Sequence, residues 1–309
     1  MFRILLVIPD LMLLTACGDH YKNDYKDNSP TSGQLRVYYD EGLHLHVRNQ
    51  VYTFQSQYPN AKIELVATVE NAAVQALFND SCEAIVVSRL LNDTESKAFA
   101  SRQYFPDYSR VAYSGVAVIT NKHTNISRLS IEDVKKLTGG DGVLKDSAGN
   151  DIKVNVLFDK NNSSVMHYMA DSVLKGSLSQ NCSVKGSTQL AIDYVSQNKN
   201  AVAFIDFAWL SDVDDPITKN AMQQIKYVPV VNEKTGRAEY PSQSSFKLGL
   251  YPFVRSVYVM RKVGDFTLAK GFESFVAGPK GQLTFLKQGL MPSRQAERVI
   301  EVNMGEAVQ

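Results

Sequence analysis

The stretch Cys82-Glu-Ala-Ile-Val-Val-Ser-Arg-Leu-Leu-Asn-Asp-Thr-Glu95 sets a strand, a polar turn and a helix start one after another. Its apolar run, residues 84–87, predicts a short buried strand. The run stops at Ser88 and Arg89, and either residue of the Asn-Asp pair that follows can cap a helix with Glu95 in its first turn. A polar pair between the carboxyl end of a strand and a helix is where open α/β sheets bind ligands.

Arg89 has two interpretations. An arginine at a strand end suits an anionic ligand, because its planar guanidinium offers a carboxylate or phosphate two parallel donors. The same side chain can instead form a structural ion pair with a neighbouring acid. The stretch itself leaves both roles open.

The chain on both sides of this stretch alternates strand and helix patterns. Before it, the order predicts a βαβαβ unit with a parallel sheet and right-handed crossovers. Its expected elements are strands at 35–39 and 62–67 and helices at 43–58 and 72–78. After it, the β-rich run 110–121, with Gly115 in its middle, is a candidate for a strand that leaves one domain and enters another.

The later part of the chain continues as an α/β protein. Ser130 is a candidate N-cap, and Gly139-Gly140 is the matching helix stop. Expected helices cover 131–137, 165–174, 188–196, 266–276 and 281–290, and expected strands cover 152–158, 201–205, 225–231 and 254–260. With 309 residues the chain is long enough for two ordinary domains.

The composition narrows the class of protein. With 44% hydrophobic and 21% charged residues, the chain is expected to fold as a soluble protein. A net charge of +1 and the lack of any Lys/Arg run argue against a nucleic-acid partner. Cys82 and Cys182 show no metal or redox spacing, so two separate buried thiols are favoured, although a disulfide stays open. No cofactor or metal is expected.

The N-terminus has the pattern of an export signal. Residues 1–16 contain a short apolar run, too short to span a bilayer as mature structure. They end in Leu14-Thr-Ala-Cys17, which resembles the lipobox of bacterial lipoproteins. The resemblance implies cleavage before Cys17 and lipidation of that residue, giving a protein anchored to a bacterial membrane in the periplasm or at the cell surface. The polar residues that follow, within 17–33, predict a flexible tether.

A larger set of motifs resembles one bacterial family, the substrate-binding component of the phosphate ABC transporter, within the type II periplasmic binding proteins. The matching stretches are Asp40-Glu41, Phe54-x-x-x-Tyr-Pro-x-Ala-x-Ile63, Ala84 to Leu91 with Glu95, Gly115 to Asn121, Leu129 to Val134 with Leu137-x-Gly139, Ser163-Ser164, Val202 to Ile205 with Trp209, and Tyr251-Pro-x-x-Arg-x-Val-Tyr258. The match covers nearly all of 34–300.

The resemblance implies an α/β, two-lobed type II periplasmic-binding-protein fold with two crossing hinge segments. Lobe I would comprise 34–115 plus 246–309, and lobe II would comprise 116–245. The ligand would be phosphate or a similar anion, held between the lobes by a monomer and passed to an ABC transporter permease. The implied protein is not an enzyme.

Strand-to-helix junctions give the candidate ligand-binding residues, because free N–H groups and a partial positive charge at helix starts attract anions. These residues are Glu41, Gly42, Glu70, Asn71, Ser88, Arg89, Asp159, Asn161, Asn162, Ser163 and Ser164. In phosphate-binding members of the family, the segment matching 159–164 carries glycine and often has an arginine ahead of it. Here both are missing, and Lys160 is the only cation. Simple N-capping is the other role open to Ser163 and Ser164.

Acids at these junctions leave the ligand open. Asp40, Glu41, Glu70 and Asp159 would repel a fully ionised anion, although one carboxylate can accept a hydrogen bond from a protonated oxyanion. A different oxyanion or a zwitterion is therefore an alternative to phosphate. Two further alternatives are a hydrolase that uses Ser163 or Ser164 with His167, one helical turn away, and a ligand sensor on the same fold.

Overall fold

The first lobe is built on a parallel sheet. The computed structural model describes residues 28–294. β1 (Gly33–Asp40) lies between β2 (Ala61–Thr68) and β3 (Ala84–Val87), and the three run parallel. The crossovers are α1 (His44–Gln57), which follows the 3-10 turn η2 (Glu41–Leu43), and α2 (Glu70–Phe78). The expected βαβαβ unit is confirmed, and every residue of β3 is buried.

The helix after β3 begins where its capping residues predict. α3 (Asp93–Ser101) has Asn92 as N-cap, whose side chain accepts a hydrogen bond from the Glu95 amide. The Glu95 carboxylate accepts one from the Asn92 amide in return, which completes a capping box. The capping box thereby fixes the start of α3.

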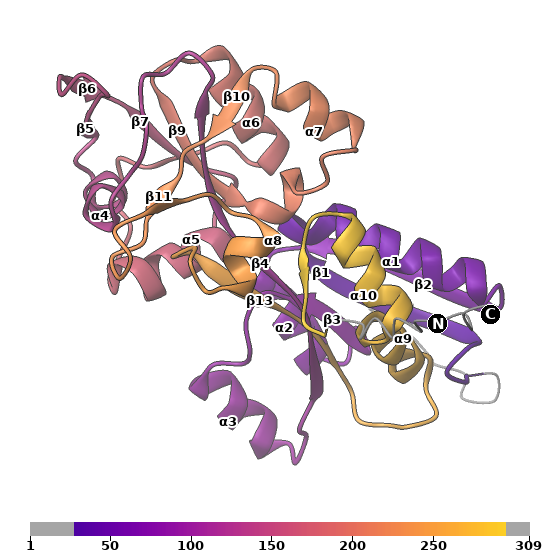
Figure 1. Ribbon diagram of the computed structural model, residues 1–309. Helices are drawn as coiled ribbons and strands as arrows, with labels where there is room; N and C mark the ends of the chain where they lie inside the picture. Colours follow the sequence, from indigo (N-terminus) through magenta and orange to yellow (C-terminus); the bar gives the residue numbers. More distant parts are fainter. Residues whose placement is uncertain (1–27, 295–309) are drawn as a thin grey trace, which may run out of the picture.

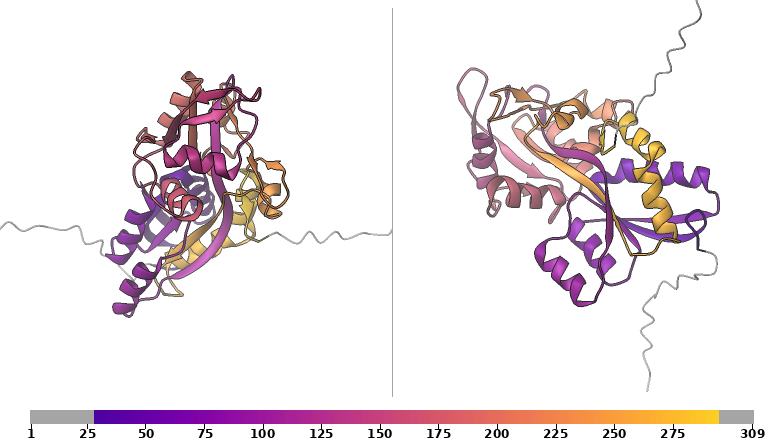
Figure 2. Two further views of the ribbon diagram at one scale, coloured as in Figure 1. Left: turned by 90° about the vertical axis from the view of Figure 1, so that its left-hand side faces the viewer. Right: turned by 60° about the horizontal axis from the view of Figure 1, so that its bottom comes forward.

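One long strand passes through both lobes. β4 (Asp107–Asn121) pairs with β13 (Val254–Arg261) as far as Gly115, and from Val116 onward it pairs with β9 (Ala201–Asp206). The sheet order is β2-β1-β3-β13-β4-β9-β7-β8. Figure 2 shows β4 curving from one lobe into the other. The two lobes are therefore connected through a continuous sheet.

The second lobe surrounds the far half of this sheet (Figure 1). β7 (Asn155–Phe158) and β8 (Ser183–Val184) extend the sheet beyond β9, and β10 (Ile225–Tyr227) pairs with β4. Two small hairpins lie outside it, β5 (Val143–Lys145) with β6 (Asp151–Lys153) and β11 (Val230–Val231) with β12 (Ala238–Glu239). The helices are α4 (Ile131–Gly139), α5 (Ser164–Tyr168), the π-helix η3 (Met169–Leu174), α6 (Thr188–Gln197), the 3-10 helix η4 (Phe207–Leu210), α7 (Pro216–Ala221) and α8 (Gln243–Lys247).

The chain then returns to the first lobe. α9 (Leu268–Ala277) and α10 (Pro279–Lys287) pack against α1, and β14 (Met291–Pro292) pairs with β4. Within 28–294, none of the helices combines the length and apolar character that crossing a membrane requires. The predicted signal peptide, Cys17 and most of the tether lie outside the described residues.

Several elements differ from their predicted form. The strand expected at 152–158 is split, because β6 turns away to pair with β5 while β7 joins the main sheet beside β9. The helix expected at 165–174 changes from α to π geometry at Met169 and ends at Lys175, which has a φ of 55°. The strand expected at 225–231 is interrupted after Tyr227.

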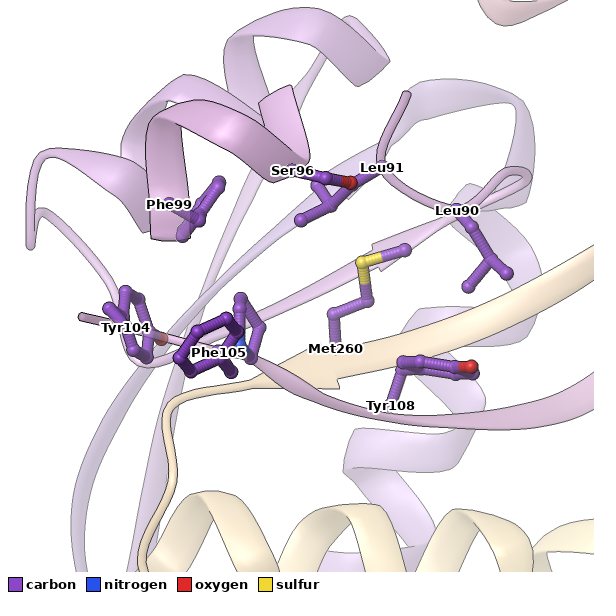
Figure 3. A pocket seen from close by; sticks show the side chains of 9 residues that line it. Leu90, Leu91, Ser96, Phe99, Tyr104, Phe105, Tyr108 and Met260 are labelled. Carbon is purple, nitrogen blue, oxygen red and sulfur yellow. The ribbon is translucent and has the colours of Figure 1, made fainter. Parts of the chain in front are cut away.

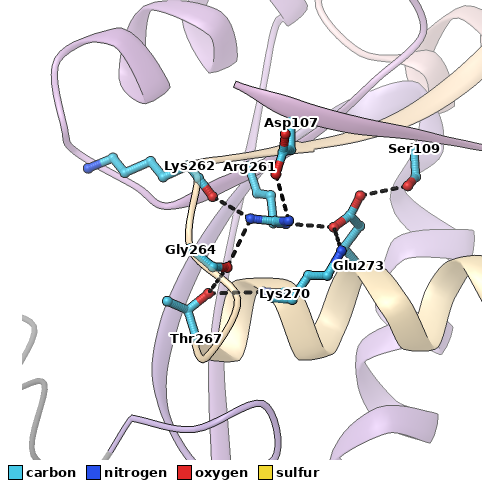
Figure 4. Close-up of polar contacts among 8 residues, drawn as sticks. All are labelled: Asp107, Ser109, Arg261, Lys262, Gly264, Thr267, Lys270 and Glu273. Carbon is cyan, nitrogen blue, oxygen red and sulfur yellow. Dashed lines mark hydrogen bonds and ion pairs between the residues drawn. The ribbon is translucent and has the colours of Figure 1, made fainter. Parts of the chain in front are cut away.

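A buried ion network fixes the end of β13 that lies away from the second lobe (Figure 4). Arg261 is 1% exposed and pairs with Glu273 of α9 at 2.5 Å and with Asp107 of β4 at 2.8 Å. Glu273 also accepts hydrogen bonds from Ser109 and Lys270. The charges are mutually neutralised, so this network has a structural role.

The two cysteines of the described chain are separate. Cys82 is buried, Cys182 is half-buried, and neither forms a disulfide. The expectation of two thiols is confirmed, but only one of them is fully buried.

Candidate functional site

Strand ends from the two lobes meet at one place. In the first lobe β1 ends at Asp40, α2 begins at Glu70 and β3 is followed by Ser88. In the second, β7 is followed by Asp159 and β9 ends at Asp206. All five side chains are buried, with exposed fractions of 7% or less. Buried polar groups at converging strand ends are the expected form of a ligand site in an α/β fold.

Arg89 is held in a structural clamp. Its Nη1 and Nη2 contact the two carboxylate oxygens of Glu95 at 2.6 and 2.8 Å. Its Nε lies 3.2 Å from Glu70, and the remaining donors reach Asn71 and the Leu90 carbonyl. Each N–H of the guanidinium thus has a protein acceptor, and Arg89 would have to give one up to bind an anion. The ion-pair interpretation describes this geometry, and ligand contact by Arg89 stays a prediction.

Two of the contacts that join the lobes at the site link the ends of strands or the starts of helices. The Ser164 hydroxyl donates a hydrogen bond to the Asp40 carboxylate, and Lys160 forms an ion pair with Glu41. The first contact is buried, whereas both side chains of the second are 20% exposed. The two lobes are therefore in direct contact at the site.

Asp40 has an unusual protonation equilibrium. The pKa of its carboxyl is raised to about 8. Burial is the largest cause and the negative charges of Glu70 and Asp206 add to it, while Arg255 and the hydrogen bond from Ser164 oppose the shift. Near neutral pH Asp40 is thus expected to hold a proton in a large share of molecules.

A second arginine lies at the site. Arg255 of β13 is 5% exposed and forms an ion pair through Nη2 with Asp206. Asp206 is fixed by hydrogen bonds from the Ser114 hydroxyl at 2.7 Å and the Ala208 amide at 2.9 Å. Gly42 allows this packing, because a Cβ there would lie 2.9 Å from the Asp206 Cβ.

The remaining predicted residues divide into buried and exposed groups. Ser88 and Asp159 are buried, and Ser88 Oγ and Asp159 Oδ1 have no hydrogen-bond partner within 28–294. Ser163 caps α5. Burial raises the pKa of Asp159, and the influence of Ser163 opposes that shift. Asn161 and Asn162 are exposed, so the structure does not bring them to the buried group.

The fold and this site can be compared with known proteins. Residues 27–280 match the model of the PBP superfamily domain, which is most of the chain. The chain belongs to the PBP superfamily. Phosphate-binding protein PstS of Pseudomonas aeruginosa is 23% identical over 303 residues, covering 90% of this chain and 89% of PstS.

Solved structures agree with this membership. A substrate-binding protein from Clostridium perfringens with bound phosphate has a TM-score of 0.69 at 17% identity, over 85% of this chain and all of that one. An ABC-type phosphate transport receptor from Vibrio cholerae has a TM-score of 0.64 at 15% identity, over 84% of this chain and all of the receptor. The expected two-lobed type II fold of this PBP superfamily member is confirmed.

The serines of this PBP superfamily chain are not arranged as a catalytic pair with His167. Ser164 donates to Asp40, and Ser163 accepts the Met166 amide. His167 accepts neither hydroxyl in the hydrogen bonds of 28–294, and its link to Ser163 is its backbone N–H to the Ser163 carbonyl. The family and the relatives named above are binding proteins, so the hydrolase alternative is not favoured.

Sequence reasoning missed Asp206 and Arg255 as site residues. Asp206 follows the very apolar strand 201–205, which is the same signal that singled out Ser88. Arg255 belongs to a motif of the family resemblance, but its position on a strand gave no reason to place it between the lobes. Only the pairing of Arg255 with Ser114, and of Val116 with Asp206, brings them together.

A separate hollow of about 370 Å³ lies on the first lobe (Figure 3). Its lining is aromatic and aliphatic, and it includes Phe99, Tyr104, Phe105 and Met260. Because no charged side chain lines it, this hollow does not suit an inorganic anion. Among the described residues, no cluster of His, Cys, Asp or Glu could hold a metal ion.

Proposed function

We propose that this chain captures inorganic phosphate, or a closely related oxyanion, between its two lobes and delivers it to the permease of an ABC transporter. The observation that carries the proposal is the meeting of buried polar groups from both lobes, two of which, Ser88 Oγ and Asp159 Oδ1, lack a partner within 28–294. The phosphate-binding name of the Pseudomonas aeruginosa relative and the phosphate in the Clostridium perfringens structure support this ligand.

The acids favour a protonated oxyanion. A carboxylate about 4 Å from an ionised oxygen repels it by on the order of 4 kcal/mol at an effective dielectric constant near 20. A P–OH group instead donates a hydrogen bond to such a carboxylate. Asp159, buried and with one oxygen free, is suited to that role. The predicted contact set of Glu41, Gly42, Glu70, Asn71, Ser88, Arg89, Asp159, Asn161, Asn162, Ser163 and Ser164 stays a prediction. In it, Arg89 is already bound by protein acceptors, and Asn161 and Asn162 are exposed.

Isothermal titration calorimetry with phosphate, sulfate and an amino acid tests the function. We expect saturable binding of phosphate at one site per chain. We expect no chemical conversion of the ligand over hours. Binding of an amino acid but not of phosphate would contradict the proposal.

The same proposal places the protein outside the cytoplasm, attached to a membrane as a monomer through a lipid on Cys17. The lipobox resemblance of residues 14–17 supports it. Fractionation of cells that express the Cys17→Ala variant is the test. The wild type should sediment with membranes, and the variant should appear in the soluble fraction. A variant that still sediments with membranes would contradict the lipid anchor on Cys17.

A further inference from the structure

Three buried polar atoms at the lobe interface lack partners within the described chain. They are Arg255 Nε, Ser88 Oγ and Asp159 Oδ1. Their side chains are 5%, 7% and 4% exposed. A buried donor or acceptor without a partner costs roughly 1–3 kcal/mol, so folded proteins rarely keep one without a reason. Twelve buried side-chain atoms within 28–294 lack a partner, and these three are the ones that belong to the converging strand ends of the two lobes.

The three atoms belong to one electrostatic neighbourhood. The Arg255 charge acts on Asp159, Asp40 and Glu70. Glu70 in turn accepts the Ser88 amide at 2.6 Å, which places Ser88 beside the same carboxylates. An anion bound beside these three atoms would therefore be attracted by the positive charge of Arg255.

The two arginines of the site differ in what they can offer. Arg89 has protein acceptors for all its donors, from Glu95, Glu70, Asn71 and Leu90. Arg255 commits Nη2 to Asp206, and its Nε–H has no acceptor in the described chain. The guanidinium is a rigid fork, so a ligand can take the Nε–H while Asp206 keeps its own contact.

We propose that Arg255, carried into the site by β13, supplies the positive charge that holds the oxyanion, with the Ser88 hydroxyl as a neighbouring donor. Asp206, itself fixed by Ser114, orients the guanidinium, and Arg89 serves as a structural clamp. This assignment rests on the proposed function and names the cation that replaces the arginine missing from the 159–164 loop.

Calorimetry with inorganic phosphate on Arg255→Gln tests the assignment. Loss of one charge-assisted contact should weaken binding about ten- to a hundredfold. Arg261→Gln is the matched control: it removes a buried, ion-paired arginine from the same strand, about 20 Å away at 3.4 Å per residue. It should lower the melting temperature and leave phosphate affinity unchanged.

Two further measurements keep the test decisive if Arg255→Gln folds poorly. The double variant Arg255→Gln with Asp206→Asn replaces the ion pair by two neutral amides and should show the same loss of affinity. In the wild type, the Nε–H resonance of Arg255, assigned by its absence in Arg255→Lys, should shift on addition of phosphate. The Nε–H resonance of Arg89 should not.

The outcomes separate the two proposals. The assignment of Arg255 is wrong, and the proposed function stands, if the wild type binds phosphate and Arg255→Gln binds it with unchanged affinity. The same holds if Arg89→Gln loses more phosphate affinity than Arg255→Gln does. A wild type that does not bind phosphate overturns both.

Discussion

At the scale of single residues, the site is a cluster of buried acidic side chains whose charges Arg89 and Arg255 partly neutralise. Asp40, Glu70, Asp159 and Asp206 are each at most 4% exposed. Keeping several carboxylates buried together is unfavourable unless some are protonated or paired. The structure uses both solutions, since Asp206 is paired with Arg255 and the Asp40 pKa is raised.

The raised pKa of Asp40 predicts a pH-dependent stability. A pKa raised from 3.8 to about 8 means that the folded protein holds this proton more tightly than the unfolded chain. The contribution of Asp40 to stability is therefore complete below about pH 4 and is lost as the pH rises to about 8. Asp40→Asn should flatten the fall in the free energy of unfolding between pH 5 and pH 9, measured by urea denaturation. Equal slopes in the variant and the wild type would contradict the shift.

The clamp around Arg89 predicts a large loss of stability. Arg89→Met leaves Glu70, which is 2% exposed, without its ion-pair partner. Breaking a buried pair costs on the order of 3 kcal/mol, whereas an exposed pair is worth about 1 kcal/mol or less. Lys145→Met, which removes the exposed pair with Asp151, is the control. Urea denaturation of the two variants should differ by about 2 kcal/mol, and similar values would count against the clamp.

At the scale of elements, local signals determined what the sequence could predict. The helix from Asp93 begins behind Asn92, one of its two candidate caps, and the helix from Ile131 begins behind the expected cap Ser130. Both were predictable because a cap depends on residues three positions apart. β3 was predicted at its observed bounds for the same reason, since its apolar run is short and isolated. Helix starts and short buried strands can thus be predicted from neighbouring residues in the sequence.

Features set by distant contacts were not predictable. β6 separates from β7 only because β5 is there to pair with it. Arg255 becomes a site residue only because Ser114, its neighbour in the sheet, donates to Asp206 of another strand. Neither fact can be inferred from the spacing of nearby residues. The sequence therefore predicted the loops of the site but did not predict that Arg255 lies in it.

The point where β4 passes between the lobes has no room for a side chain at Gly115, so adding a methyl group there should destabilise the fold. At Gly115 a Cβ would lie 2.8 Å from the Phe253 carbonyl oxygen and 3.1 Å from the Phe246 ring. Gly115→Ala should therefore lower the free energy of unfolding by about 1–3 kcal/mol. Gly139→Ala makes the same change where nothing lies within 4 Å, and it should be neutral or stabilising. Thermal denaturation of the pair checks this, and equal melting temperatures would refute it.

At the scale of the whole molecule, several polar contacts join the two lobes, among them Asp206 with Arg255 and His46 with Ser211. Ser164 with Asp40 and Lys160 with Glu41 join strand ends of opposite lobes. Under the proposed function, ligand entry requires these contacts to break, as in binding proteins that close by hinge motion. The division of the lobes at residues 115 and 245 stays a prediction.

Loss of the Lys160 pair should favour the open form. Without phosphate, Lys160→Met is expected to have a larger radius of gyration than the wild type in small-angle X-ray scattering, and phosphate should reduce the difference. Lys145→Met, whose ion pair lies within one hairpin, should match the wild type. Identical radii for Lys160→Met and the wild type would show that this pair does not hold the lobes together.

The unbroken course of β4 has a mechanical consequence. Because the strand continues through the crossing, and the Val116 N–H donates to the Phe253 carbonyl at 2.9 Å, lobe rotation must be absorbed by bending a hydrogen-bonded strand. We expect such a connection to act as an elastic spring that resists wide opening of the lobes. The rate at which the Val116 amide hydrogen exchanges with solvent would then report how often the spring flexes.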